Sequence, residues 1–153
     1  MKSTVQIRAA RPPDAPLLLP LIEQYWRFEH IEGFDAERIT PQLTRVLSDV
    51  RLGRAWIAYN DGQPAGYLLG VFVFSLEHQG LTAVIDELFV LPEYRSLGLG
   101  RRLLEVAETQ FRAQGCTAVA IELGRANIIA RAFYVSLGYE HRSGFELLNK
   151  SLT

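Results

Sequence analysis

The stretch LPEYRSLGLGRRLLEVAETQF, residues 91–111, joins the end of an apolar segment to a long amphipathic segment through a turn with two glycines. After the turn, apolar residues recur at helical spacing, at Leu99, Leu103, Leu104, Ala107 and Phe111. The first N–H groups of a helix lack partners and carry about half a positive charge, so they attract anions. Gly98 and Gly100 would let a bulky anion reach the backbone, and Arg95 and Arg101 would add positive charge. The stretch therefore predicts an anion site, with phosphate as the expected guest.

Two common phosphate loops do not match this turn. It lacks the lysine and Ser/Thr of G-x-x-x-x-G-K-[ST], which argues against a loop for a metal-bound triphosphate, and it does not read G-x-G-x-x-G. For the two glycines alone, a plain turn with solvated arginines is the structural alternative. The rest of the sequence must show whether the two glycines form a plain turn or an anion-binding site.

Length and composition limit the classes of protein to which the chain could belong. At 153 residues the chain is long enough for one domain, 1–153, with its own core. Lys and Arg number 16 against 17 Asp and Glu, and the net charge of -1 removes the usual electrostatic argument for nucleic-acid binding. The single cysteine, Cys116, cannot form an internal disulfide, which favours a reducing compartment. The apolar runs are too short to span a bilayer and residues 1–16 have no signal-peptide core, so we expect a cytoplasmic protein without a membrane partner.

Two hydrophobic periods alternate along the chain. Alternating segments predict strands at 4–10, in two runs split by the turn NDGQP within 54–75, and at 81–92, 117–123 and 144–152. Helical spacing predicts helices at 12–29 and 35–53, one from Leu99 to the region before Gly115, and a short one at 127–138 that Asn127 could cap and Gly138 could end. The order β-α-α-β-β-β-α-β-α-β indicates an α/β domain with a mixed central sheet of about six to seven strands and about four helices.

Two motifs in this order carry a family resemblance. The turn reads Arg95-x-x-Gly98-x-Gly100, and the later segment NIIARAFYVSLGYE, residues 127–140, reads Asn-x-x-Ala-x-x-Phe-Tyr-x-x-x-Gly-Tyr. Both resemble the signatures of the GNAT superfamily of acetyl-CoA-dependent N-acetyltransferases. The element order agrees as well, although the helical region 12–51 matches only in pattern. The resemblance implies a GNAT-like single domain with acetyl-CoA as co-substrate.

The resemblance also implies how the donor is held. Backbone N–H groups of the segment SLGLGR would cradle the pyrophosphate of coenzyme A without a metal, helped by Arg95. The segment comprises Ser96, Leu97, Gly98, Leu99, Gly100 and Arg101. In the family the strand before this loop splays from its neighbour, which would leave the backbone of Leu88, Phe89 and Val90 free for the pantetheine amides. A bulge there would aim an N–H at the thioester oxygen, and Asn127 would contact the cofactor or cap its helix.

Tyr134 is the candidate general acid, because the family pattern places a tyrosine there, close to the thioester sulfur. A leaving thiolate with a solution pKa of about 8.5 needs modest help, which a phenol of pKa about 10 can supply. An isolated tyrosine in such a segment would instead be read as a core aromatic, which is the interpretation we give to its neighbour Phe133.

Asp86 and Glu87 are the candidates for receiving the proton of the amine, which is protonated at neutral pH with a pKa of about 10. Asp86 matches the position of an acidic residue that assists deprotonation in polyamine-type relatives, and Glu87 is the alternative. Adjacent strand residues face opposite sides unless a bulge intervenes, so one of the two should line the site. Relay through water or electrostatic holding of the cation is expected rather than direct abstraction. If the pair is structural, its charges need partners, for which Arg54 and Arg125 are candidates.

The acceptor should contact YWRFEHIEGFDAE, residues 25–37, where GNAT relatives bind acceptors and where aromatic and acidic residues gather. Tyr25, Trp26 and Phe28 with Glu29 and Glu32 would suit a cationic small molecule or a peptide amine, while a solvated helix end is the structural alternative. His30, His78 and His141 lack metal-ligand spacing, so no metal is expected. We therefore predict direct attack of an amine on acetyl-CoA in a ternary complex, with a non-catalytic acyl-CoA-binding module as the alternative. The resemblance also suggests a homodimer.

Overall fold

The computed structural model describes residues 2–153, which form two compact units, one ending at Ile121 and one running from Glu122 to Thr153. The strands of the first unit are β1 (Val5–Ala9), β2 (Gly53–Asn60), β3 (Gln63–Ser75), β4 (Gly80–Val90) and β5 (Val119–Ile121). Its helices are α1 (Ala15–Phe28), α2 (Ala36–Ser48) and α3 (Leu99–Ala113), with 3-10 turns at Pro12–Asp14 and Pro92–Tyr94. This order confirms the predicted order as far as β5.

The sheet has the strand order β1-β2-β3-β4-β5. The first four strands run antiparallel to their neighbours, and β5 runs parallel to β4. The connection between β4 and β5 is the helix α3, as a parallel pair requires a crossover. The predicted mixed α/β sheet is therefore confirmed.

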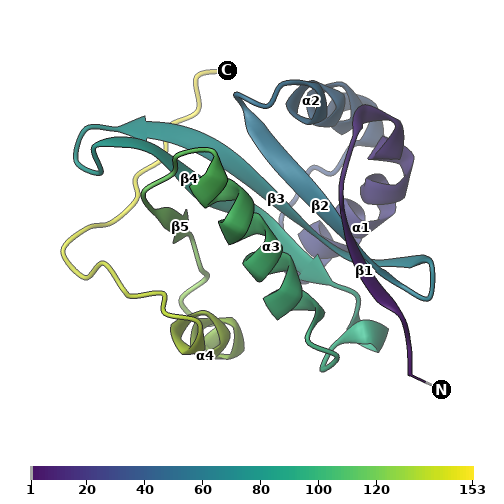
Figure 1. Ribbon diagram of the computed structural model, residues 1–153. Helices are drawn as coiled ribbons and strands as arrows, with labels where there is room; N and C mark the ends of the chain where they lie inside the picture. Colours follow the sequence, from purple (N-terminus) through teal and green to yellow (C-terminus); the bar gives the residue numbers. More distant parts are fainter. Residues whose placement is uncertain (1) are drawn as a thin grey trace. The chain divides into compact units, whose positions relative to one another are not determined.

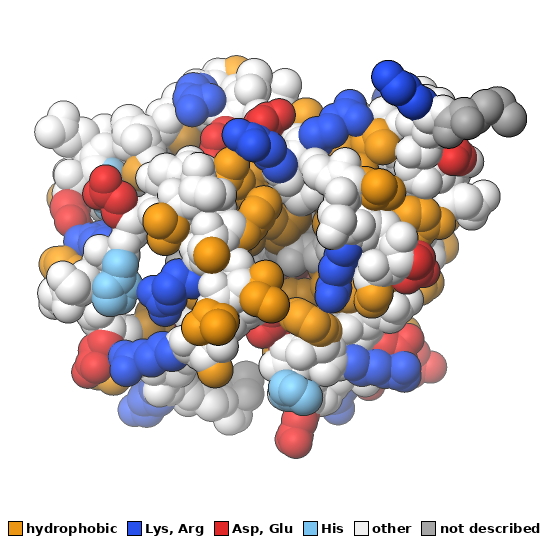
Figure 2. Space-filling view, turned by 90° about the horizontal axis from the view of Figure 1, so that it is seen from below, with side chains coloured by type: hydrophobic (Ala, Val, Ile, Leu, Met, Phe, Trp, Pro, Cys, Tyr) orange, Lys and Arg blue, Asp and Glu red, His pale blue; other side chains and the backbone are white. Residues whose placement is uncertain are grey.

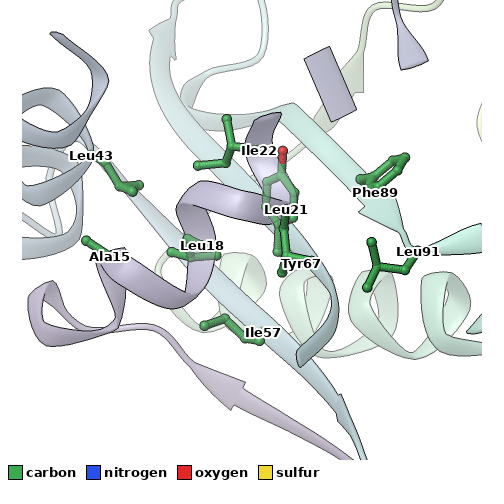
Figure 3. Packing of buried hydrophobic residues seen from close by; sticks show 9 residues of the cluster. All are labelled: Ala15, Leu18, Leu21, Ile22, Leu43, Ile57, Tyr67, Phe89 and Leu91. Atoms are coloured by element: carbon green, nitrogen blue, oxygen red, sulfur yellow. The ribbon is translucent and has the colours of Figure 1, made fainter. Parts of the chain in front are cut away.

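Helices cover both faces of this sheet, with α3 on one face and α1 and α2 on the other (Figure 1). On the α1 face, the apolar residues of α1 recur at helical spacing and pack against β2, β3 and β4 (Figure 3). This cluster consists of Ala15, Leu18, Leu21, Ile22, Leu43, Ile57, Tyr67, Phe89 and Leu91. The α1 face thus holds a continuous core up to the end of β4.

On the α3 face, Phe111 fills the space beside the sheet. Its ring meets Trp56 and Phe72 edge-on, with centroids 5.5 and 5.9 Å away. Gly70 makes this possible, because a Cβ built there would lie 2.5 Å from the Cζ of Phe111. The contact packs the C-terminal half of α3 closely against β3.

The second unit contains one helix, α4 (Ile128–Ser136). Asn127 caps it as predicted, since its side-chain oxygen accepts a hydrogen bond from the N–H of Ala130 at 3.1 Å. Gly138 follows the helix end with a φ of 94°.

The predicted last strand, residues 144–152, is absent from the described part of the chain, and the predicted strand 117–123 shortens to Val119–Ile121. A strand exists only where its N–H and C=O groups pair with a neighbouring strand, and no other strand is described within Glu122–Thr153. The alternating side chains are exposed instead, with Phe145 at 71% and Leu148 at 83% of their full exposure. The expectation of six to seven strands is therefore wrong, and the sheet has five.

Charged side chains of both signs are interspersed on the face shown in Figure 2. None of the helices in residues 2–153 has the length and hydrophobicity needed to cross a bilayer. Within the same residues, His, Cys, Asp and Glu side chains do not gather in groups of three or more that could hold a metal ion.

Candidate active site

The turn before α3 has a backbone shaped for an anion. Ser96 and Gly98 both lie in the left-handed region, with φ of 66° and 76°. Alternating left-handed residues turn successive N–H groups toward one side, and Gly98 is the N-cap of α3 without a side chain that could satisfy the helix start. The N–H groups that open α3, at Leu99, Gly100 and Arg101, therefore remain available to an anion.

The two arginines of the turn differ in what they contact. Arg95 folds back, and its Nε donates to the carbonyl of Val90 at 3.0 Å. Its guanidinium lies over the rings of Phe28 and Phe89, at 4.9 and 5.4 Å from their centroids. Arg101 projects from the first turn of α3 and pairs with Glu105 at 3.3 Å, with both side chains largely exposed. In this structure Arg101, rather than Arg95, is the arginine whose charge stands at the helix start.

A hollow of about 420 Å³ opens between α1 and the end of β4. It is lined by Pro20, Glu23, Gln24, Arg27, Phe28, Phe89, Pro92 and Arg95. Its walls combine aromatic rings with charged groups, and Glu23 and Arg27 on the rim form an ion pair at 2.9 Å.

The end of β4 is open along one edge. β5 pairs only with Ala83–Ile85, so in the described chain β4 has no strand partner on that side beyond Ile85. The N–H of Leu91 donates to Ala65 on β3, and hydrogen-bonding direction alternates along an antiparallel strand. The backbone groups of Leu88 and Val90 therefore point toward the open edge. Those of Phe89 point toward β3, so the three residues predicted to act together do not share one orientation.

A bulge in β4 separates the two candidate carboxylates. Gly70 pairs with Ile85 and the adjacent Leu69 pairs with Glu87, which leaves Asp86 as the extra residue. Gly70 faces Phe111, so its partner Ile85 faces α3, whereas Glu87 shares the α1 face with Phe89. Asp86 is exposed and Glu87 is half-buried. The sequence alone could not show this bulge. Because of it, Glu87 faces α1 although Ile85, two residues earlier, faces α3.

Glu87 is held by two neutral donors. The indole Nε1 of Trp26 donates to its Oε2 at 2.7 Å, and the hydroxyl of Tyr67 donates to its Oε1 at 2.8 Å. Burial raises the pKa of Glu87 to about 7; these two hydrogen bonds act in the opposite direction and the charge of Asp86 adds to the rise. The carboxyl can therefore change its protonation state near neutral pH.

The partners of Glu87 differ from those that sequence reasoning offered. A buried carboxylate was expected to need partners, but Arg54 and Arg125 were the candidates, whereas the structure supplies Trp26 and Tyr67. The sequence places Trp26 among the residues expected to contact the acceptor, and it does not single out Tyr67. The available signal was a tyrosine in an otherwise apolar stretch of β3, whose hydroxyl must find a partner once buried.

Aromatic side chains of α1 cover the end of β4, as the composition of residues 25–37 suggested. Tyr25 and Phe28 each lie 5.9 Å from Phe89 between ring centroids. Trp26 meets Phe34 edge-on at 5.8 Å. Glu29 is half-buried, and Glu32 is exposed in the loop before α2. The aromatic wall therefore forms, while the charge inside it comes from Glu87.

Tyr134 lies in the second unit, on α4, with 5% of its surface exposed. Its ring meets Phe133 and Tyr139 at 5.1 and 5.3 Å between centroids. Tyr134 and Asn127 thus stand on the same short helix, one buried and one at its cap.

Comparisons with known proteins agree with this geometry. The model of the acetyltransferase (GNAT) family matches residues 18–139. The uncharacterized N-acetyltransferase YhfO of Bacillus subtilis is 28% identical over 92% of this chain and 93% of its own. The integron cassette protein HFX_CASS3, from the mobile metagenome of Cole Harbour Salt Marsh, superposes with a TM-score of 0.85 at 27% identity, over 97% of this chain and 91% of its own.

A solved aminoglycoside N-acetyltransferase shares the fold as well. AAC(6')-Iy, determined in complex with CoA, superposes with a TM-score of 0.84 at 19% identity, over 98% of this chain and 97% of its own. At this identity the likeness concerns the fold alone. The family match, in contrast, spans most of the chain and includes both the turn at Arg95–Gly100 and the segment at Asn127–Tyr139. The chain therefore belongs to the GNAT family of acetyltransferases and is an N-acetyltransferase.

Proposed function

We propose that this N-acetyltransferase transfers the acetyl group of acetyl-CoA directly to an amine, and that Glu87 receives the proton of that amine. The observation that carries the proposal is the half-buried carboxylate of Glu87, fixed by two hydrogen bonds beside the open edge of β4. The reaction needs a donor site, a proton acceptor and a proton donor, and the chain offers a candidate for each.

The donor site that we propose uses the turn before α3 and the open edge of β4. N–H groups at the start of α3 suit a pyrophosphate, because they are clustered and Gly98 leaves the approach unobstructed. The backbone of Leu88 and the N–H of Val90 suit the amides of a pantetheine arm, which would pair with β4 as a short strand does, while the carbonyl of Val90 accepts from Arg95. The complex of AAC(6')-Iy with CoA supports the choice of CoA, since that protein has the same fold.

Glu87 suits the proton transfer better than an ordinary carboxylate. An alkylammonium of pKa about 10 loses its proton more readily to a base of pKa about 7 than to one of about 4. The neutral amine then attacks the acetyl carbon and loses its second surplus proton to water, the carbon–sulfur bond breaks, and the thiolate leaves with the electron pair. A water between the amine and Glu87 would serve as relay, and exposed Asp86 would add negative charge that attracts the cation.

Tyr134 is the proposed donor of the proton to the leaving thiolate. Its place in the Asn127–Tyr139 motif on α4 supports this role, because a neutral phenol can donate a hydrogen bond or a proton to the leaving sulfur. No covalent intermediate with the enzyme is needed. The acceptor that we propose is a small cationic amine or a peptide amine, in keeping with the aromatic wall of Tyr25, Trp26 and Phe28.

The test is release of free thiol from acetyl-CoA with a panel of polyamines, amino acids, aminoglycosides and peptide N-termini. We expect release with at least one amine, and a fall in kcat of about 100-fold or more in Tyr134→Phe with unchanged affinity for acetyl-CoA. Absence of release with every amine, despite tight CoA binding, would support an acyl-CoA-binding module instead. Turnover of Tyr134→Phe equal to that of the unchanged enzyme would remove Tyr134 from the mechanism.

The donor site has its own test in Gly98→Glu, which places a carboxylate against the phosphates. We expect CoA binding, measured by calorimetry, to be lost. Gly98→Asn is the matched control, because asparagine tolerates the left-handed backbone of this position without adding charge. Equal affinity of Gly98→Glu and Gly98→Asn for CoA would overturn the phosphate assignment.

A further inference from the structure

We infer that Trp26 and Tyr67 are positioning residues for the reaction, which hold the two carboxylate oxygens of Glu87 and set the pH at which it can receive the proton of the acceptor. The inference rests on the proposed role of Glu87. It concerns two residues from separate elements, α1 and β3, that neither motif of the chain includes.

The geometry assigns one donor to each oxygen. Trp26 Nε1 lies 2.7 Å from Oε2 and Tyr67 Oη lies 2.8 Å from Oε1, both within the usual range of hydrogen bonds. A carboxylate has about four acceptor positions, so each oxygen keeps a further lone pair for an ammonium or a water. Both donors are neutral, so they orient the carboxylate while leaving its negative charge uncompensated for a cationic acceptor.

The donors are themselves held in place by packing. Tyr67 is 1% exposed and meets Tyr25 edge-on at 6.4 Å between centroids. Trp26 is half-buried and packs edge-on against Phe34. Because the partners lie 61 and 20 residues away from Glu87 along the chain, the fold itself fixes the carboxylate. Such fixation lowers the reorganisation needed when the amine arrives.

The same two bonds oppose the effect of burial on Glu87. Burial raises its pKa, the bonds to Trp26 and Tyr67 favour the charged form, and the balance leaves the pKa at about 7. The titratable groups recorded around it are Asp86 beside it on β4, Tyr67 on β3 and, next to Tyr67, Tyr25 on α1. Burial, the charge of Glu87 and their hydrogen bond raise the pKa of the Tyr67 hydroxyl far above its usual range, so it stays a donor throughout.

Loss of either donor should therefore move the titration of Glu87 upward. We expect Trp26→Phe and Tyr67→Phe each to shift the acid limb of kcat/KM by about one pH unit or more toward higher pH, the size of a hydrogen bond to a charged group. The controls are Trp56→Phe, which changes a tryptophan on the α3 face, and Tyr59→Phe, which changes a half-buried tyrosine on β2. Both should leave the limb in place.

A direct titration separates this inference from the proposed function. Because the chain has two tryptophans, Trp56→Phe leaves Trp26 as the only indole, and its fluorescence should titrate with Glu87 near pH 7 and cease to do so when Glu87→Gln is added. For Tyr67→Phe in this background the fluorescence midpoint should rise. For Trp26→Phe the ¹³C signal of the Glu87 carboxyl, assigned by its loss in Glu87→Gln, should report the same rise without any substrate.

The outcomes distinguish the two ideas. Higher midpoints together with shifted acid limbs support the inference. Unchanged midpoints in every donor variant that folds overturn it, even if the enzyme is active and Glu87→Gln is not. Higher midpoints with an unchanged acid limb overturn the role of Glu87 as proton acceptor, and with it the functional meaning of the two bonds. Trp26→Phe and Tyr67→Phe alter different elements, so a folding defect in one variant need not affect the other. Thermal unfolding shows which variants are folded, and one folded variant suffices for the test.

Discussion

The two tryptophans of the chain contrast the two faces of one sheet. Trp56 lies on the α3 face, 2% exposed, with its ring edge-on to Phe111. Trp26 lies on the α1 face, half-buried, with its indole N–H donated to Glu87. The side chains packed around Trp56 on the α3 face are aromatic and aliphatic. The α1 face, in contrast, encloses the carboxylate of Glu87, whose charged form is disfavoured by burial. Changes at Trp56 and Phe111 on the α3 face should therefore alter stability, whereas changes at Trp26 and Glu87 on the α1 face should also alter activity and its pH dependence.

The bulge at Asp86 is the feature that allows this division. In a regular strand Ile85 and Glu87 would face the same side, and one of them would be misplaced. With Asp86 as the extra residue, Ile85 supports the core under α3 and Glu87 enters the α1 face. The strand then continues without β5, which ends at Ile121. The bulge at Asp86 thus lies at the point where the Glu87 carboxylate enters the α1 face and where β4 loses β5 as its neighbour.

Phe111→Ala should have the largest effect on stability. Removal of a buried aromatic side chain from a packed core costs about 3–5 kcal/mol, and Gly70 on β3 cannot fill the space with a side chain of its own. Urea unfolding should show this loss, while the midpoint of the Glu87 titration stays unchanged. A displaced midpoint would mean that the two faces are coupled, against the division described above.

Glu87→Gln should lower activity and raise stability. We expect kcat/KM to fall by about 100-fold or more through loss of the proposed proton acceptor. The pKa of Glu87 is raised from the ordinary 4.5 to about 7, so the folded chain binds this proton more tightly than the unfolded chain. Stability of the unchanged protein should therefore fall as pH rises from about 4.5 to about 7, and remain lower above that.

Glutamine carries no charge at any pH, so the Glu87→Gln variant should not lose stability in this way as the pH rises. The difference between pKa 4.5 and about 7 corresponds to an upper limit of about 3 kcal/mol at pH 8. Denaturant unfolding of both proteins at pH 4 and pH 8 measures it, with Glu105→Gln as a control at an exposed glutamate. Equal pH dependence for the unchanged protein and Glu87→Gln would contradict the perturbed titration.

Local features of the sequence predicted local features of the fold. The helix after Gly98 follows from the spacing of Leu99 to Phe111, and the cap at Asn127 follows from its side chain, because both depend on neighbours along the chain. The strand expected at 144–152 fails for the opposite reason. Its alternation of apolar residues is real, but a strand also requires a ladder partner, which the sequence pattern does not specify.

The site was predictable only in part. The motif around Gly98 and the acidic pair could be located, since they lie within short stretches. The contact of Glu87 with Tyr67, the bulge at Asp86 and the folded-back Arg95 depend on strand register and on packing between distant segments. The contacts of Arg95 with aromatic rings of α1 and β4 could not be foreseen from its place beside the glycines, and its role at the phosphate stays a prediction.

Arg95→Ala should have the smallest effect on stability. It tests whether the groups that govern the titration of Glu87 extend as far as the rim of the hollow between α1 and β4. The guanidinium joins α1 to β4 by stacking on Phe28 and Phe89 and by its hydrogen bond to Val90. Exposed contacts of this kind contribute about 0.5–1 kcal/mol each and are not additive when they share one side chain, so we expect a loss of about 1–2 kcal/mol in urea unfolding. Arg27→Ala, which removes an exposed ion pair on the same rim, should cost less than about 0.5 kcal/mol. Because no hydrogen bond or ion pair joins Arg95 to Glu87 among the described contacts, the acid limb of kcat/KM should stay in place, and a shift there would extend the proposed proton-accepting site to the rim.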